Sequence, residues 1–156
     1  MKSIESRVEA LETHLSALAD REAIRELTAR YCRAVTNDDM ETLLTLFAED
    51  GALDTTFPPG SGQDHTETRG LEALRETYQG TAGMQLKPCV HNHVIEVDGD
   101  RASGFCSVEI RLVQDGEAYT AAGHYEDTYR RADDGWRFER RSLVLYHWVR
   151  QTEGWA

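Results

Sequence analysis

The sequence predicts an α+β domain, in which a helical first half precedes a sheet of antiparallel strands. Over residues 4–48 and again over 70–78, apolar side chains recur every three or four positions, as they do along one face of a helix. From residue 89 onward, apolar and polar side chains alternate, which is typical of half-buried strands. Asp-Gly pairs at 98–99, 115–116 and 134–135 divide this second half where hairpin turns are expected. Helices followed by consecutive strands favour α+β over a βαβ architecture.

The first segment, residues 1–18, is predicted to form an amphipathic helix. Its large apolar residues follow a spacing of four and three positions, as in the a and d positions of a heptad repeat: Ile4, Val8, Leu11, Leu15 and Leu18. Two heptads are too short to be stable alone. We therefore expect this seam to pack either on another subunit or on its own domain.

Two further helices are expected before the sheet. Asp20 is a candidate N-cap for a second helix, and its predicted buried stripe is Ile24, Leu27, Tyr31 and Val35. Asp38 and Glu41 have the spacing of a capping box and predict a third helix over 39–48.

A polar segment and a short helix are expected next. Residues 49–68 are rich in turn formers, so we expect a loop of about 20 residues, either a lid or a disordered tip. A short strand over 54–57 is expected within it. Residues 70–78 are predicted to form a short helix.

Composition limits the domain organisation and the classes of partner. The chain has 156 residues, so we expect one domain over residues 19–150 with a short tail at 151–156. Its 28 acidic and 17 basic side chains give a formal net charge of −11. Such a chain has no excess of Lys and Arg for a phosphate backbone or an anionic membrane surface. We therefore expect neither nucleic acid nor a membrane as a partner.

The cysteines and the N-terminal segment predict a cytoplasmic protein. Cys32, Cys89 and Cys106 are an odd number without a CxxC pair, which is typical of reduced thiols. No apolar run approaches the roughly 20 residues of a membrane-spanning helix. The first 20 residues also lack the apolar stretch of a signal peptide.

The predicted strands, roughly 89–97, 100–114, 117–133 and 136–149, bring polar side chains onto one apolar face. If the first two Asp-Gly pairs form two-residue turns, Val97 faces Asp100 and Gln114 faces Glu117. The resulting rows contain His91, Cys106 and Tyr125, then His93, Gly104 and Asp127. An acid, imidazoles and a phenol on an apolar surface are typical of a small-molecule site.

This arrangement assigns candidate roles. His91 or His93 is the candidate general base, and Asp127 orients it or acts as the acid. The candidate substrate-binding residues are Tyr31, Val35, Cys106 and Tyr125, and the two phenols among them would polarise a substrate oxygen. Alternatively, Asp127 bonds backbone or an arginine at the sheet rim, and the histidines are satisfied core residues. A metal held by His91, His93 and a third ligand is a weaker alternative, so we predict no metal and no cofactor.

The chain resembles the SnoaL-like branch of the nuclear transport factor 2-like superfamily over residues 18–145. The resemblance is carried by these runs: DREAIREL (20–27), YCRAV (31–35), LLTLFAEDG (43–51), HNHVIEVDGD (91–100), YEDTYR (125–130) and GWRF (135–138). It implies a cone, in which a curved, mainly antiparallel sheet wraps around helices and encloses a pocket. Relatives include scytalone dehydratase, hexachlorocyclohexane dehydrochlorinase, ketosteroid isomerase, polyketide cyclases, dioxygenase small subunits and non-catalytic binding proteins.

The resemblance also locates functional positions. In dehydratase-like and dehydrochlorinase-like members, an Asp near the end of the long helix orients a His base on the first long strand. Those positions correspond to Thr36 and Pro88 in this sequence, and His91 lies three residues beyond the second. Arg141 resembles the pocket arginine of the dehydrochlorinase, which makes it a further candidate substrate-binding residue. It points inward only if the last strand contains a bulge.

Two functions remain open from the sequence. The first is a cofactor-independent lyase or isomerase, of dehydratase or cyclase type, acting on an apolar cyclic or carbonyl compound. The second is a non-catalytic ligand-binding or assembly module of the same fold. The expected partners are a small apolar organic ligand and further copies of the chain, as a homodimer or homotrimer.

Overall fold

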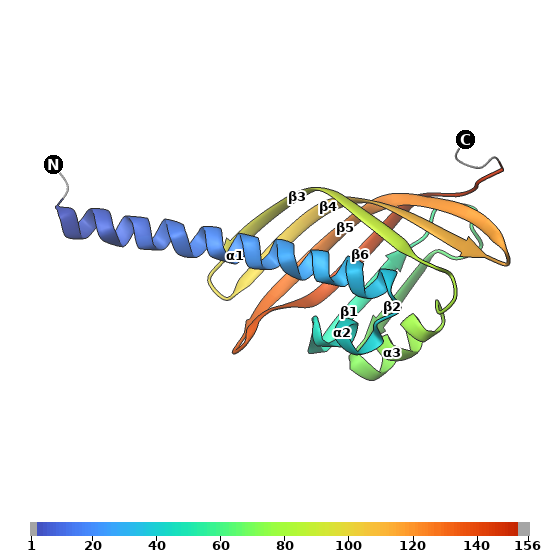
Figure 1. Ribbon diagram of the computed structural model, residues 1–156, viewed down its shortest axis with the longest axis horizontal. Helices are drawn as coiled ribbons and strands as arrows, with labels where there is room; N and C mark the ends of the chain where they lie inside the picture. Colours follow the sequence, from blue (N-terminus) through green and yellow to red (C-terminus); the bar gives the residue numbers. More distant parts are fainter. Residues whose placement is uncertain (1–2, 153–156) are drawn as a thin grey trace.

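The computed structural model describes residues 3–152 and confirms the α+β class. A single six-stranded sheet has the order β2-β1-β6-β5-β4-β3, and a long helix, α1, crosses one of its faces (Figure 1). β1 and β6 are parallel, and all other neighbours are antiparallel. No helix in residues 3–152 is both long enough and apolar enough to span a membrane.

α1 runs without interruption from Ile4 to Thr36, so the predicted boundary at Asp20 is wrong. No glycine or proline lies within this stretch to end the first helix. The Asp20 carboxylate instead accepts hydrogen bonds from Arg131 and the indole N–H of Trp136. This contact ties the middle of α1 to the hairpin between β5 and β6.

The two parts of α1 differ in burial. The predicted stripe from Ile24 to Val35 is buried, together with Thr28 and Ala34. The five seam residues at 4–18 are all exposed, so the alternative that they pack on their own domain is wrong. The predicted N-terminal segment begins at residue 1, but residues 1 and 2 lie outside the described residues. The same is true of residues 153–156 of the predicted tail.

The segment after α1 is more ordered than the sequence predicts. Helix α2 covers only Met40–Thr45, because Phe47 already begins strand β1, Phe47–Thr56. β1 pairs with β2, His65–Arg69, so the expected loop over 49–68 is wrong and only 57–64 connect the two strands. The predicted short helix is confirmed as α3, Leu71–Gln79.

The four remaining strands confirm the predicted meander. They are β3, Lys87–Asp98; β4, Arg101–Gln114; β5, Glu117–Ala132; and β6, Gly135–Arg150. The predicted register between β4 and β5 is confirmed, with Tyr125 opposite Cys106 and Asp127 opposite Gly104.

The predicted register between β3 and β4 is wrong by two residues between the turn and Val94, and by one residue from His91 back to Lys87. Val97 pairs with Ala102, so the turn is formed by Gly99 and Asp100. Gly99 has a φ of 59°, which suits the first central position of a type II′ turn. The inward rows of β3 are therefore displaced from their expected partners on β4.

Two bulges decide which side chains face the interior. In β3 the register shifts between His91 and Val94, and Asn92 has a φ of 54°. In β6 it shifts after Phe138, which pairs with Tyr129, so that Arg141 faces inward. The resemblance required this second bulge, and the structure contains it.

Candidate functional site

A cavity of about 530 Å³ lies between the sheet, α3 and the C-terminal half of α1. Most of its wall is apolar, with several threonines at one side. The predicted residues Tyr31, Val35 and Tyr125 line it, whereas Cys106 and Arg141 do not. Cys106 is fully buried, and burial raises the pKa of its thiol to about 12, so it is a packing residue.

Two of the tyrosines that line the cavity are joined through their hydroxyls. The hydroxyls of Tyr31 and Tyr78 are 2.9 Å apart and hydrogen-bonded. Burial raises the pKa of both phenols above the ordinary value, so they stay protonated. The sequence predicted the short helix that carries Tyr78 but gave no sign that its hydroxyl would meet Tyr31. The two hydroxyls carry two protons, and the hydrogen bond between them uses one. The pair can therefore donate the second proton in a hydrogen bond to an oxygen of a bound ligand.

Arg141 lies behind this wall and is completely withdrawn from solvent. Its guanidinium carbon is 3.7 Å from the ring centre of Tyr125, 4.1 Å from that of Tyr31 and 4.5 Å from that of Phe138. Burial opposes its charge, but the Asp127 carboxylate raises the pKa of Arg141 above its ordinary value. Cation–π contacts with three rings replace part of its lost hydration.

A chain of polar side chains continues from Arg141 toward β3. Its Nη2 atom is 3.4 Å from Oδ2 of Asp127, which accepts a hydrogen bond of 3.0 Å from the Tyr129 hydroxyl. That hydroxyl is also 3.3 Å from Nε2 of His93. The structure therefore brings His93 and Asp127 together, with Tyr129 between them, and none of the three lines the cavity.

The protonation states of this chain follow from burial. Burial raises the pKa of Asp127 to about 6, although Arg141 and the Tyr129 hydroxyl both act to lower it. Burial, together with the positive charges of Arg141 and Arg25, lowers the pKa of His93 to about 4. His93 is thus a neutral imidazole near pH 7 and a weak base.

His91 is not part of this group. The expected position beside Cys106 is wrong, because the bulge and the displaced register place it opposite Ser107 on the outer face. Its side chain is exposed. The catalytic role assigned to His91 from the sequence therefore has no geometric support.

The comparison with family models decides the family. A model described as a SnoaL-like domain matches residues 16–142. The chain belongs to the SnoaL-like family. No curated protein sequence matches it significantly.

Solved structures agree with this SnoaL-like assignment. A nuclear transport factor 2-like protein with a cystatin-like fold from Novosphingobium aromaticivorans is 27% identical, with a TM-score of 0.69 over 93% of this chain and 91% of that one. A candidate scytalone dehydratase from the same organism is 22% identical, with a TM-score of 0.74 over 88% and 91%. A hexachlorocyclohexane dehydrochlorinase (LinA) of type 2 is 21% identical, with a TM-score of 0.75 over 92% and 97%. The last two share the fold with this chain.

The positions that the resemblance assigns to a catalytic dyad are not acid–base groups in this SnoaL-like chain. Thr36 is the last residue of α1, and Pro88 lines the cavity. Among the described residues of the cavity wall there is no carboxylate, imidazole, ammonium or guanidinium. The hydroxyls of the tyrosines and threonines, the amide of Gln63 and the indole of Trp148 supply its polar side-chain groups.

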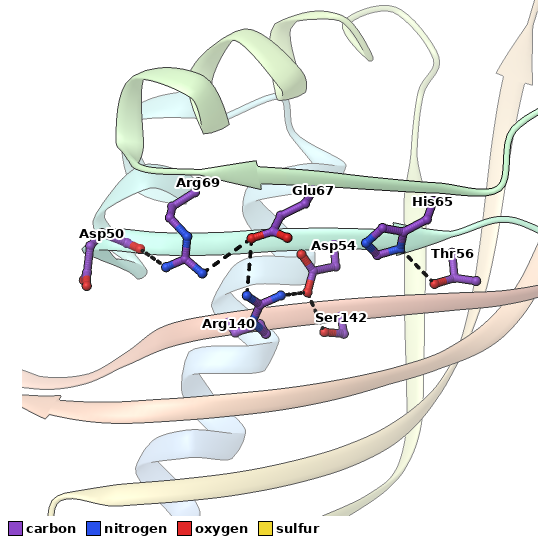
Figure 2. Close-up of polar contacts among 8 residues, drawn as sticks. All are labelled: Asp50, Asp54, Thr56, His65, Glu67, Arg69, Arg140 and Ser142. Atoms are coloured by element: carbon purple, nitrogen blue, oxygen red, sulfur yellow. Dashed lines mark hydrogen bonds and ion pairs between the residues drawn. The ribbon is translucent and has the colours of Figure 1, made fainter.

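A second polar cluster lies where strands β2, β1 and β6 run side by side (Figure 2). Asp54, His65 and Glu67 have potential ligand atoms within 4.8 Å of one another. However, Arg140 forms ion pairs with both carboxylates, and His65 bonds the Thr56 hydroxyl. These contacts already engage the three groups, so we interpret the cluster as an ion-pair network that joins the strands.

Asp54 is a second buried strand carboxylate besides Asp127. Its Oδ2 atom is paired with Arg140 and accepts a hydrogen bond of 3.1 Å from Ser142. The alternation of β1 could not be recognised because the segment was expected to be a loop.

Proposed function

We propose that this SnoaL-like protein binds a small, mostly apolar compound with a carbonyl or hydroxyl oxygen and promotes a lyase-type elimination from it. The observation that carries the proposal is the buried hydroxyl pair of Tyr31 and Tyr78 on an otherwise largely apolar cavity wall. In this proposal the hydroxyl pair binds the oxygen of the ligand, and the apolar wall binds its carbon skeleton.

The size and lining of the cavity support the binding step. A volume of about 530 Å³ is within the range of roughly 300–1,000 Å³ that is usual for small-molecule sites. An apolar wall with a few convergent donors selects an apolar compound that places an acceptor oxygen opposite those donors. A ligand without such an oxygen leaves a buried donor unpaired, which costs about 1–3 kcal/mol.

Arg141 supports the polarising step. Tyr31 and Tyr125 contact the cavity and also present their ring faces to the guanidinium. A positive charge fixed behind the donors stabilises negative charge that develops on a bound oxygen, and the dry surroundings strengthen this effect. Asp127 and His93 are then positioning residues, which hold Arg141 through the ion pair and the Tyr129 hydroxyl.

The reaction class is supported by fold. Two of the similar structures are named as a dehydratase and a dehydrochlorinase, and both names describe eliminations. In a dehydration of this kind the hydroxyl pair donates a proton to the departing hydroxyl, which leaves as water, and the proton released from the adjacent carbon returns to the hydroxyl pair.

Non-catalytic binding is the second candidate, and one observation favours it. Thr36 and Pro88 occupy the dyad positions, and the described cavity wall offers no carboxylate or imidazole as a proton acceptor. Both candidates predict the same ligand chemistry, so turnover separates them.

Binding is tested with a matched set of ligands: an aromatic ketone, its alcohol, and the hydrocarbon of the same shape. We expect the wild type to bind the ketone or the alcohol about tenfold more tightly than the hydrocarbon, because one good hydrogen bond contributes a binding free energy of about that size. Tyr31→Phe and Tyr78→Phe should remove that preference. Tyr146→Phe, which deletes an exposed hydroxyl bonded to His124, is the matched control. Equal affinity for all three ligands would refute the proposal.

Turnover is tested on the alcohols that bind. Mass spectrometry of the mixture should show loss of water in the wild type and much less in Tyr31→Phe. Binding that depends on Tyr31 without any product would reject the lyase and support the non-catalytic candidate.

A further inference from the structure

The N-terminal half of α1 extends beyond the rest of the domain as an arm, defined here as residues 4–19 (Figure 1). Its five seam residues, at 4, 8, 11, 15 and 18, are between 46% and 79% exposed. An apolar stripe of this length is unusual on a free helix, because a surface helix normally buries its apolar face. The arm therefore has a face that residues 3–152 of its own chain do not cover.

The domain cannot cover this face by a small movement. An α-helix advances about 100° per residue, so the seam points about half a turn away from the stripe of α1 that packs on the sheet. That stripe is centred on Ile24, Leu27 and Tyr31. Since α1 is one continuous helix, the seam and the sheet lie on opposite sides of it.

We propose that two copies of the chain join through their arms in a parallel, two-stranded coiled coil. The seam has Ile4, Leu11 and Leu18 at d positions, and Val8 and Leu15 at a positions. A β-branched residue at a with Leu at d favours two strands. This proposal is independent of the function proposed for the cavity.

The charges beside the seam favour the parallel arrangement. Glu5 and Glu12 occupy e positions, whereas Arg7 and Arg21 occupy g positions. In a parallel pair, g of one helix faces e of the next heptad of the other, so Arg7 meets Glu12 of the second copy. In an antiparallel pair, e faces e and g faces g, which would oppose like charges.

The rest of the molecule is compatible with this pairing. The heptad frame continues to Glu22 and Arg25, whose charged and exposed side chains end the apolar seam where α1 joins the sheet. Because the sheet lies on the far side of α1, the two domains would point outward from the coiled coil.

The first experiment measures the mass of the full-length protein in solution by sedimentation equilibrium. We expect the wild type to have the mass of two chains and the Leu11→Glu/Leu15→Glu variant to have that of one. Thr13→Glu/Ala17→Glu adds the same charges to the opposite face of the arm and should remain a dimer. A monomeric wild type, an assembly of any other size, or a seam variant that dimerises like the wild type would overturn the proposal. Circular dichroism verifies that each variant keeps its fold.

The second experiment tests the direction of the two arms by disulfide formation in a Cys89→Ser background, since Cys89 is the exposed native thiol among the described residues. A parallel pair places the two copies of Leu18 side by side, so Leu18→Cys should cross-link to itself under mild oxidation. An antiparallel pair would place Leu18 beside Ile4 of the second copy. A Leu18→Cys protein that cross-links only when mixed with an Ile4→Cys protein would contradict the parallel arrangement.

Discussion

The Nη2 atom of Arg141 lies 3.4 Å from Oδ2 of Asp127, and the two side chains are 0% and 1% exposed. They are directly opposite each other on the paired strands β6 and β5. None of the three guanidinium nitrogens has a hydrogen-bond partner among the described residues, so ring faces and one carboxylate provide its surroundings. Each charge therefore depends strongly on the other.

Arg141→Met should destabilise the protein by about 3–5 kcal/mol, because it leaves the buried Asp127 carboxylate without its cation. Urea unfolding measures this change in free energy. Adding Asp127→Asn should recover part of the loss, since the remaining side chain is then neutral. A cost below about 1 kcal/mol for Arg141→Met would show that the pair is not coupled.

Gly104→Ala should disturb the polar chain between His93 and Asp127. A methyl group at this position would be 2.9 Å from the Tyr129 hydroxyl and 3.2 Å from Nε2 of His93. We expect a loss of about 1–3 kcal/mol in the free energy of unfolding, as is usual when a packed site is overfilled. Ser103→Ala, at the neighbouring outward position, is the control and should change stability little. Equal stability of both variants would refute the close packing at Gly104.

His93 should make stability fall with acidification. Its pKa drops from 6.5 in the unfolded chain to about 4 in the folded protein, first because of burial and then because of Arg141 and Arg25. The folded form binds the proton more weakly, so its stability is complete above about pH 6.5 and declines as the pH falls toward about 4. We expect the melting temperature to fall more between about pH 7 and pH 5 in the wild type than in His93→Gln.

Asp127 acts in the opposite direction in the same range. Its pKa is raised to about 6 in the folded protein, so the stability that it contributes is lost as the pH rises. This contribution is common to the wild type and His93→Gln, and it cancels in the comparison. If the melting temperatures of the two proteins fall equally between about pH 7 and pH 5, the lowered pKa of His93 is contradicted.

Arg140→Met should cost more stability than Arg69→Met. Arg140 pairs with the buried Asp54 and with Glu67, whereas Arg69 pairs with the half-exposed Glu67 and a backbone carbonyl. We expect about 1–3 kcal/mol for Arg140→Met and less than about 1 kcal/mol for Arg69→Met. Thermal or urea unfolding of the two variants decides this, and equal costs would mean that the Asp54 pair contributes no more than an exposed one.

The predictable parts of the fold were those governed by local sequence. The turn at Asp115 and Gly116, with both φ angles positive, fixes the register of β4 and β5 and thus the inward position of Asp127. β1 was missed because its partners, β2 and β6, are distant in sequence and its turn-rich neighbourhood resembles a loop.

The same contrast applies to the candidate site. Tyr31 and Tyr125 were found from helical periodicity and from register, and both line the cavity. His91 was misplaced because a bulge leaves little trace in a single sequence. The inward position of Arg141 also depends on a bulge, and only the family resemblance indicated it.

The bulge in β3 has a further consequence for how this strand is built. Pro88 and Val90 face inward, and the next side chain to do so is His93. Two residues therefore separate Val90 from His93, where a regular strand has one. Deleting Asn92 from the chain would restore strict alternation and leave every inward side chain inward. The strand is thus equivalent to a regular one with a single inserted residue, and the insertion changes how far along the sheet His93 lies without changing the face that it occupies.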